Sequence, residues 1–200
     1  MASRWRAAAG VVAVVVLAGC GGPPSEADLS GAVLTEPYVV PDTALTDTGG
    51  EPFSLASDTD KRLSLVFFGY TNCPDICQTV MANVTAALTR LDEADREQVD
   101  MVFVTTDPAR DDGQTLRTYL DRFDPGFVGL TGELDDITAI GHDLGVAVEQ
   151  GERLPSGGYE VTHSTQVVGV DGNDRAPIVW TEGTSAGEFA SDIHLLLGDA

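Results

Sequence analysis

The segment that most constrains the fold is an uninterrupted apolar run followed directly by a helical pattern. Residues Leu63–Phe68 are apolar apart from Ser64 and partly β-branched, which is typical of a buried central strand. From about Asp75 to Leu91 the apolar residues recur at helical spacing, namely Ile76, Val80, Val84, Leu88 and Leu91. A central strand that passes straight into an amphipathic helix indicates an α/β domain.

The remaining elements predict the topology of that domain. A turn signal at residues 47–50 separates 39–45 from 53–55 and predicts a short hairpin. After the first long helix we expect a strand at 99–104, a helix capped by Asp111 or Asp112, a helix at 134–144, strands at 145–149, 159–162, 165–170 and 177–181, and a closing helix at 185–197. This order predicts a thioredoxin-like α/β fold, in which helices flank a mixed central sheet, with an N-terminal hairpin and an extra helix.

The first nineteen residues differ from the rest of the 200-residue chain. Arg4 and Arg6 precede an apolar run at 7–16 that is too short for a comfortable membrane span, and Leu17–Cys20 then resembles a bacterial lipobox. A plain secretory peptide or an uncleaved anchor helix is the alternative. We expect a signal peptide at 1–19, a flexible tether at 20–37 and the folded domain at 38–200, lipid-anchored through Cys20 at the outer face of the cell membrane.

The composition is strongly acidic. Eleven basic and thirty-two acidic residues give a net charge of −21, and removal of the leader would take away two arginines and no acid. Such a surface repels nucleic acid and anionic lipid headgroups, which excludes both as expected partners. It suits cations or basic protein patches, although solubility alone explains it as well.

Two of the three cysteines form a pair that suggests redox or metal chemistry. Cys73 and Cys77 lie where the central strand passes into the first long helix, and they are too close in sequence to form a useful structural disulfide. A helix start presents unpaired N–H groups and a partial positive charge, which predicts a lowered thiol pKa there. Alternatively, the pair packs in the core, but Pro74 and Asp75 predict an exposed turn.

Two thiolates favour Cu(I) or zinc, whereas a site that also holds Cu(II) needs an imidazole. His142 and His194 fall within predicted helices and are most simply surface or half-buried residues. His163 instead lies at a short polar junction before a strand. In a thioredoxin-like topology this junction approaches the start of the first long helix, so His163 can reach Cys73 and Cys77.

Four ordered motifs resemble the Sco/SenC family of copper-delivery proteins. They are Phe68–Cys77 (FGYTNCPDIC), Thr106–Asp111 (TDPARD), Leu130–Gly132 (LTG) and Val161–Thr165 (VTHST). The resemblance covers the chain from about Tyr38 to its end. It implies a thioredoxin-like fold and one copper ion per chain, Cu(I) or Cu(II), held by Cys73, Cys77 and His163.

The resemblance also implies a function and partners. The function is delivery of copper to the binuclear copper site of cytochrome c oxidase; the oxidase subunit that carries this site is the expected partner, together with other copper chaperones or thiol reductants. Three residues depart from the family pattern: Asn72, Gln78 and Thr162. Thr162 replaces an aspartate that often precedes the ligand histidine, and loss of such a partner of the imidazole can weaken metal affinity.

Two enzymatic alternatives compete with a carrier. In the first, Cys73 and Cys77 cycle between dithiol and disulfide, and the protein is a thiol–disulfide oxidoreductase that acts on copper apoproteins. In the second, Thr71 and Cys73 belong to a peroxiredoxin-like peroxidase, although that class gives no role to His163. A requirement for His163 distinguishes copper delivery from thiol exchange.

Overall fold

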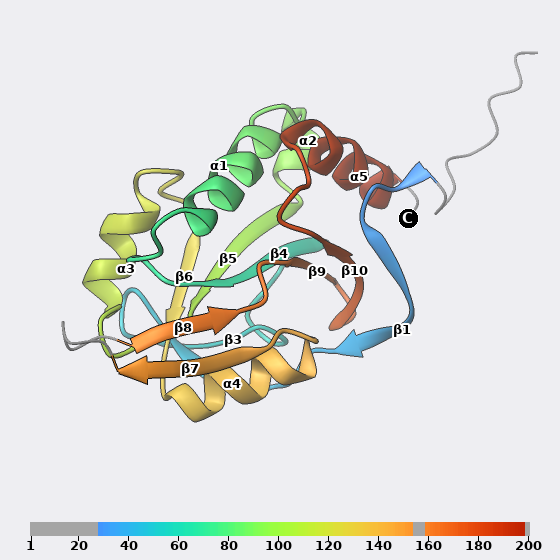
Figure 1. Ribbon diagram of the computed structural model, residues 1–200. Coiled ribbons are helices and arrows are strands. Elements are labelled where there is room, and N and C mark those ends of the chain that lie inside the picture. Colours follow the sequence, from blue (N-terminus) through green and yellow to red (C-terminus); the bar gives the residue numbers. More distant parts are fainter. Residues whose placement is uncertain (1–27, 154–158, 199–200) are drawn as a thin grey trace, which may run out of the picture.

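The computed structural model describes residues 28–153 and 159–198, so the leader and the expected lipidation site Cys20 lie outside the described residues. Its core is an eight-stranded mixed sheet in the order β1-β10-β9-β4-β5-β6-β2-β3 (Figure 1). The strands of this sheet are β1 (Ala32–Val39), β2 (Ala44–Asp47), β3 (Pro52–Ser54), β4 (Leu63–Gly69), β5 (Val99–Thr105), β6 (Val128–Thr131), β9 (Val167–Asp171) and β10 (Arg175–Trp180). The helices are α1 (Ile76–Leu88), α2 (Glu93–Arg96), α3 (Gly113–Leu120), α4 (Leu134–Asp143) and α5 (Ala186–Gly198).

The apolar run forms β4, and every residue of β4 is buried. It pairs parallel with β5 and antiparallel with β9, as expected for a central strand with neighbours on both edges. Because side chains alternate across the pleat, Leu65 and Phe67 pack on one face, and Val66 and Phe68 on the other.

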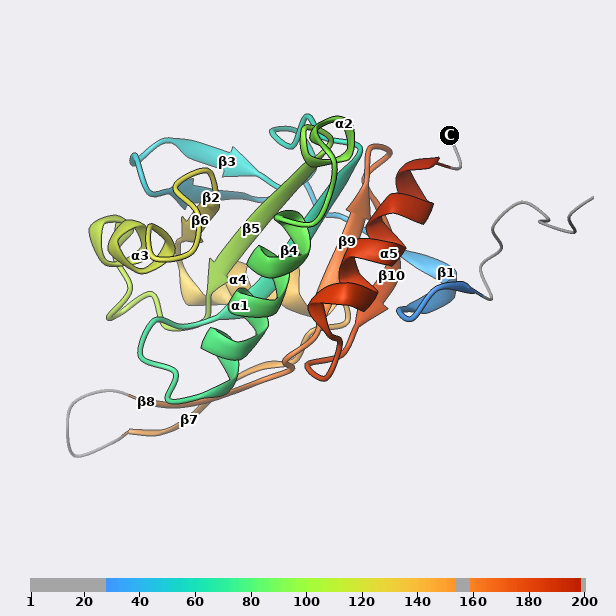
Figure 2. The same cartoon turned by 90° about the horizontal axis from the view of Figure 1, so that it is seen from above.

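Helices cover both faces of the sheet. The apolar faces of α1, α3 and α5 contribute to one core cluster with Phe67, whereas α4 contributes to the second cluster with Phe68. Figure 2 shows α1 and α5 side by side over the sheet, and the two helices contact each other. The mixed α/β architecture predicted from the sequence is therefore confirmed.

The start of the chain differs from the expectation. The predicted hairpin is present as β2 and β3, but it begins at Ala44, because the segment before it forms the separate strand β1. Residues 32–37, which the sequence assigned to the tether, belong to β1, and Ala32 and Val33 among them pair with β10, so the expected boundary at residue 38 falls inside a strand. β1 is an edge strand with largely exposed side chains, and it therefore lacks the apolar alternation that would reveal it.

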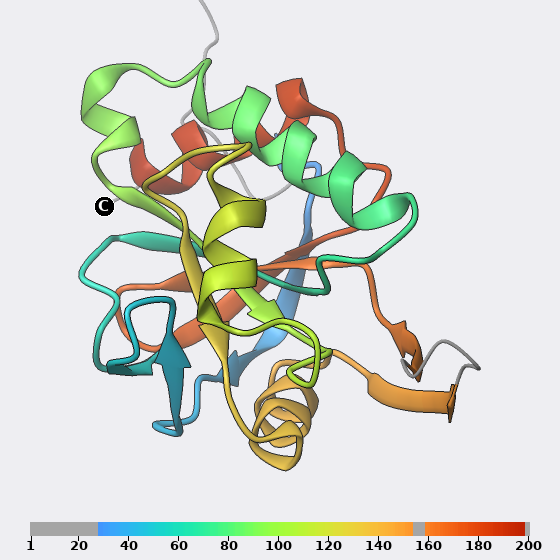
Figure 3. The same cartoon turned by 90° about the vertical axis from the view of Figure 1, so that its left-hand side faces the viewer.

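The C-terminal half also contains a separate two-stranded ribbon, β7 (Val148–Arg153) and β8 (Tyr159–His163), which pair with each other outside the main sheet (Figure 3). The four-residue helix α2 was not expected. Of the two candidate caps for α3, Asp112 is the N-cap, and its side chain accepts the N–H of Thr115 at 2.8 Å. In the described part of the chain, no helix has both the length and the apolarity to cross a bilayer.

Candidate metal and thiol site

The cysteine pair lies in the connection from β4 to α1. Cys77 is in the first turn of α1, and its N–H donates to Cys73 Sγ at 3.3 Å. The N-cap residue Asp75 makes no side-chain capping bond, so the Cys73 sulfur satisfies an N–H group that a helix start leaves without an intrahelical partner. The sulfur of Cys73 is thus held against the turn that carries Cys77.

Both cysteines are buried, and neither forms a disulfide. Cys73 is 4% exposed and Cys77 is fully buried, and both belong to the core cluster that includes Met81 of α1. The turn expected from Pro74 and Asp75 is exposed, but this exposure does not extend to the two sulfur atoms. Of the two cysteines, Cys73 alone keeps some exposed surface.

The pKa of the Cys77 thiol is raised, which differs from the expectation for a helix start. Burial is the main cause, because it disfavours the charged thiolate, and the hydrogen bond shared with Cys73 adds to it. Backbone hydrogen bonds from Tyr70 and Cys77 itself act in the opposite direction but are outweighed. The helix start could be predicted from the sequence. The burial of Cys77 depends on the packing around α1, and its effect on the thiol pKa outweighs that of the backbone hydrogen bonds.

Tyr70 is a residue of the site that had no predicted role. Its carbonyl accepts the N–H of Cys73 at 3.2 Å, and its hydroxyl forms a hydrogen bond with the Cys73 side chain. The pKa of Tyr70 is raised, first by burial and then by the two neighbouring thiols. Its position between the end of β4 and the cysteines is the only signal in the sequence that could have indicated it.

The histidines lie in three different settings. The side chains of His142 on α4 and His194 on α5 are 88% and 68% exposed, in agreement with the surface positions expected for them. His163 is the last residue of β8, and its backbone pairs with Val148 of β7. The side chain of His163 lies outside the described part of the structure. Its contact with the cysteines therefore stays a prediction.

The sheet register bears on that prediction. β9 begins at Val167, which is paired with Phe67, close to the end of β4 where the cysteine connection starts. The segment from His163 to β9 therefore enters the sheet at the same end from which the connection to α1 leaves. Among the side chains that the structure describes, no group of three His, Cys, Asp or Glu residues is close enough to hold a metal ion.

Comparisons with known proteins agree with one another. The SCO1/SenC family profile matches residues 33–198. A candidate copper-binding protein of Stutzerimonas stutzeri is 37% identical over 149 residues, which are 73% of this chain and 72% of that protein. The match to the mitochondrial SCO2 protein of Saccharomyces cerevisiae is 35% identical but spans only 32% of that protein's length.

Solved structures of the same kind share the fold. The solution structure of apo Sco1 from Thermus thermophilus has a TM-score of 0.74 at 28% identity, and the alignment covers 84% of this chain and 96% of that one. The structure of Bradyrhizobium japonicum ScoI with copper bound has a TM-score of 0.67 at 28% identity and covers 79% of this chain and 96% of that one. These likenesses confirm the thioredoxin-like fold predicted from the sequence.

Proposed function

This chain belongs to the SCO1/SenC family, and we propose that it is an extracytoplasmic copper carrier that delivers copper to the binuclear copper site of cytochrome c oxidase. Cys73, Cys77 and His163 would hold one copper ion per chain as cargo. The observation that carries this proposal is the pair of cysteines at the start of α1, which form no disulfide and in which Cys73 Sγ accepts the N–H of Cys77.

The donor chemistry fits copper. Two sulfur ligands held at one helix turn suit Cu(I), and an imidazole from the segment before β9 would complete a set that also accepts Cu(II). The apolar surroundings of Cys77 limit the access of water to a bound ion, which is one of the ways a protein tunes a metal site. The copper-bound ScoI of Bradyrhizobium japonicum provides a precedent on the same fold.

Thiol–disulfide exchange is the second candidate function, and it uses the same two sulfur atoms. A disulfide between Cys73 and Cys77 would remove both thiolate ligands, so the oxidised protein could not carry copper through them. The two functions differ in their need for His163, which is a ligand in delivery and has no part in exchange.

We also propose the cellular setting. Cys20 would carry a lipid anchor that holds the domain at the outer face of the cell membrane, where the oxidase subunit with the binuclear copper site, other copper chaperones and thiol reductants are the partners. The short apolar leader and the residues that surround Cys20 support this setting.

Substitution of His163 tests the proposed function. Wild-type protein loaded with Cu(II) should show a sulfur-to-copper charge-transfer absorption with one copper per chain. We expect His163→Ala to lose or greatly weaken the Cu(II) absorption, to reduce Cu(I) binding less, and to keep disulfide exchange with a small dithiol.

His142→Ala and His194→Ala are the matched controls, because both side chains lie on exposed helix surfaces. Neither should change the copper spectrum or stoichiometry. If His163→Ala left the Cu(II) species intact while His142→Ala removed it, the assignment of the third ligand would be wrong.

A further inference from the structure

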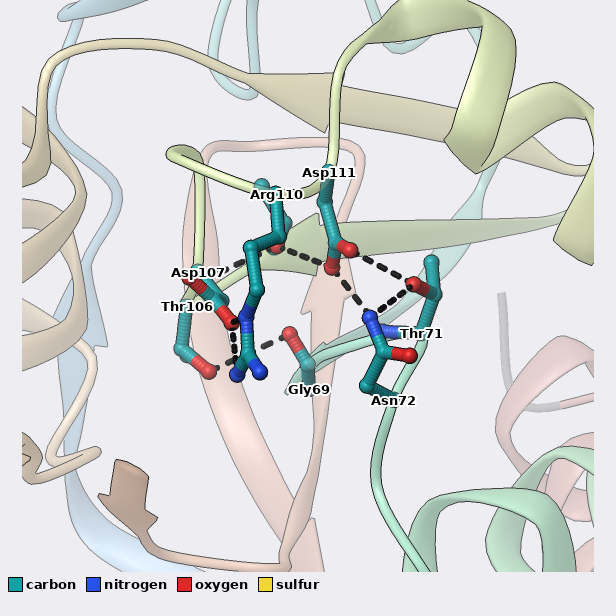
Figure 4. Close-up of polar contacts among 8 residues, drawn as sticks. Gly69, Thr71, Asn72, Thr106, Asp107, Arg110 and Asp111 are labelled. Atoms are coloured by element: carbon teal, nitrogen blue, oxygen red, sulfur yellow. Dashed lines mark hydrogen bonds and ion pairs between the residues drawn. The ribbon is translucent and has the colours of Figure 1, made fainter. Parts of the chain in front are cut away.

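The segment that leads into the cysteine pair is fastened to a buried carboxylate. Asp111 is fully buried, and it accepts the N–H of Thr71 at 2.8 Å and the Thr71 hydroxyl at 2.5 Å (Figure 4). It also accepts the Thr105 hydroxyl at 2.7 Å. One carboxylate therefore joins the chain just before Cys73 to the last residue of β5.

The turn that presents this carboxylate is itself fixed. The N–H of Asp111 donates to the carbonyl of Asp107 at 3.0 Å, and the buried carboxylate of Asp107 forms an ion pair with Arg110. Gly69 lies just before Tyr70 in the chain. Its carbonyl accepts two hydrogen bonds from Thr106, one from the N–H at 2.7 Å and one from the hydroxyl at 3.2 Å. The turn thus holds the residues on both sides of Tyr70.

These contacts continue to the sulfur atoms. Tyr70 receives the Cys73 N–H on its carbonyl and bonds the Cys73 side chain through its hydroxyl, and Cys73 Sγ in turn accepts the N–H of Cys77. A displacement of Thr71 would therefore move Tyr70 and Cys73 together.

Asp111 is not needed to begin α3, because its neighbour Asp112 already caps that helix. A carboxylate suits this position, since one backbone N–H and two hydroxyls donate to Asp111 and a carboxylate only accepts. An asparagine of the same shape has a single acceptor oxygen and no charge. If that oxygen keeps the Thr71 N–H and the Thr105 hydroxyl, the Thr71 hydroxyl loses its carboxylate acceptor and must turn to accept from the amino group.

We propose that Asp111 is a positioning residue that holds the Thr71–Cys73 segment so that the two thiols stay together and closed to solvent. This inference rests on the proposed function where it concerns copper, and on the buried thiols alone where it concerns their reactivity. It also gives a role to the Thr106–Asp111 motif, which the copper ligands themselves do not use.

The test compares Asp111→Asn with Asp192→Asn in the reduced full-length chain. Asp192 is the matched control, because it is equally buried and accepts the N–H groups of Ser30 and Gly31 and the indole N–H of Trp180, at 2.7 to 3.1 Å, away from the cysteine connection. Loss of stability alone should affect both variants alike.

Two readouts report on the site itself. The first is the rate at which dithiodipyridine labels the thiols, which local opening of the connection should limit. We expect Asp111→Asn to accelerate labelling about tenfold while Asp192→Asn stays close to the wild type. The second is Cu(II) affinity measured by chelator competition, which should fall about tenfold or more in Asp111→Asn only.

The outcomes separate this inference from the proposed function. If the wild type binds no copper but Asp111→Asn still accelerates labelling, the copper proposal is wrong and the positioning role stands. Equal labelling and equal copper affinity in Asp111→Asn and the wild type would overturn the positioning role.

A second pair of variants serves if Asp111→Asn does not fold. Thr71→Val removes the hydroxyl and keeps the backbone N–H and the side-chain shape, whereas Thr71→Ser restores the hydroxyl. Faster labelling in the valine variant, with recovery in the serine variant, is the expected result. Wild-type rates in both variants would overturn the positioning role.

Discussion

At the scale of single residues, buried aspartates hold together segments that are distant in the sequence. In the described part of the structure Asp107, Asp111 and Asp192 are buried, and each has polar partners at hydrogen-bonding distance. A buried carboxylate is stable only when such partners compensate for its lost hydration. Each of these residues therefore determines which backbone segments lie next to one another.

Asp192 allows a prediction about stability. Its carboxylate binds two backbone N–H groups just before β1 and the indole N–H of Trp180, so Asp192→Asn should leave at least one buried donor without an acceptor. We expect a loss of about 2–4 kcal/mol in the free energy of unfolding, measured by urea denaturation.

The control for this change is Asp174→Asn. Asp174 is exposed and has a φ of 58°, a left-handed conformation that asparagine adopts as readily as aspartate. Its effect should stay within about 0.5 kcal/mol. A similar effect of the two substitutions would contradict the role assigned to Asp192.

At the scale of elements, a histidine–carboxylate pair joins α5 to α2. His194 Nδ1 lies 2.6 Å from Asp95 Oδ2, and this hydrogen bond is the main reason that the pKa of His194 is raised, with the charges of Asp95 and Asp92 adding to it. Because the folded protein holds the proton more tightly than the unfolded chain, the pair stabilises the fold fully below the ordinary histidine pKa. That stabilisation is lost as the pH rises through the raised pKa.

We therefore expect His194→Gln to destabilise the protein more at pH 5.5 than at pH 8.5. The first pH lies about one unit below the ordinary histidine pKa, and the second lies about two units above it. Urea unfolding of the wild type and the variant at both pH values measures the difference. His142→Gln is the control, since His142 faces only Asp143 of its own helix, at 3.5 Å. A difference for His194→Gln that grew with pH would contradict the assignment.

At the scale of the whole molecule, the start of the described chain and the β7–β8 ribbon lie on opposite sides. β1 runs beside β10 and α5, whereas β7 and β8 project from the other side (Figure 2). An anchor at Cys20 would thus lead into the β1 side and leave the ribbon that ends in His163 directed away from it.

The anchor itself gives the last prediction. We expect Cys20→Ser to block lipidation and to release the protein from the membrane fraction or to mislocalise it, because the apolar run at 7–16 is too short for a comfortable membrane span. Fractionation followed by mass analysis of the mature N-terminus measures this, with Cys73→Ser as a control that should stay anchored. Full retention of an unprocessed Cys20→Ser protein would indicate an uncleaved anchor helix instead.

The sequence by itself determined the parts of this protein that depend on local pattern. The buried strand β4, the helical repeat of α1 and the cysteine pair between them follow from the order of apolar and polar residues, because periodicity records which side of an element is buried. The same local pattern predicted surface or half-buried positions for His142 and His194, and both side chains are exposed.

Only the tertiary structure decided the features that depend on distant segments. β1 is a strand because β10 offers it an edge, Asp111 turns inward because Asp112 already caps α3, and the pKa of Cys77 is raised because the core closes over it. In each case the local pattern allowed two outcomes. Burial and hydrogen bonding to residues far away in the sequence selected one of them, since desolvation and pairing energies arise only when those segments meet.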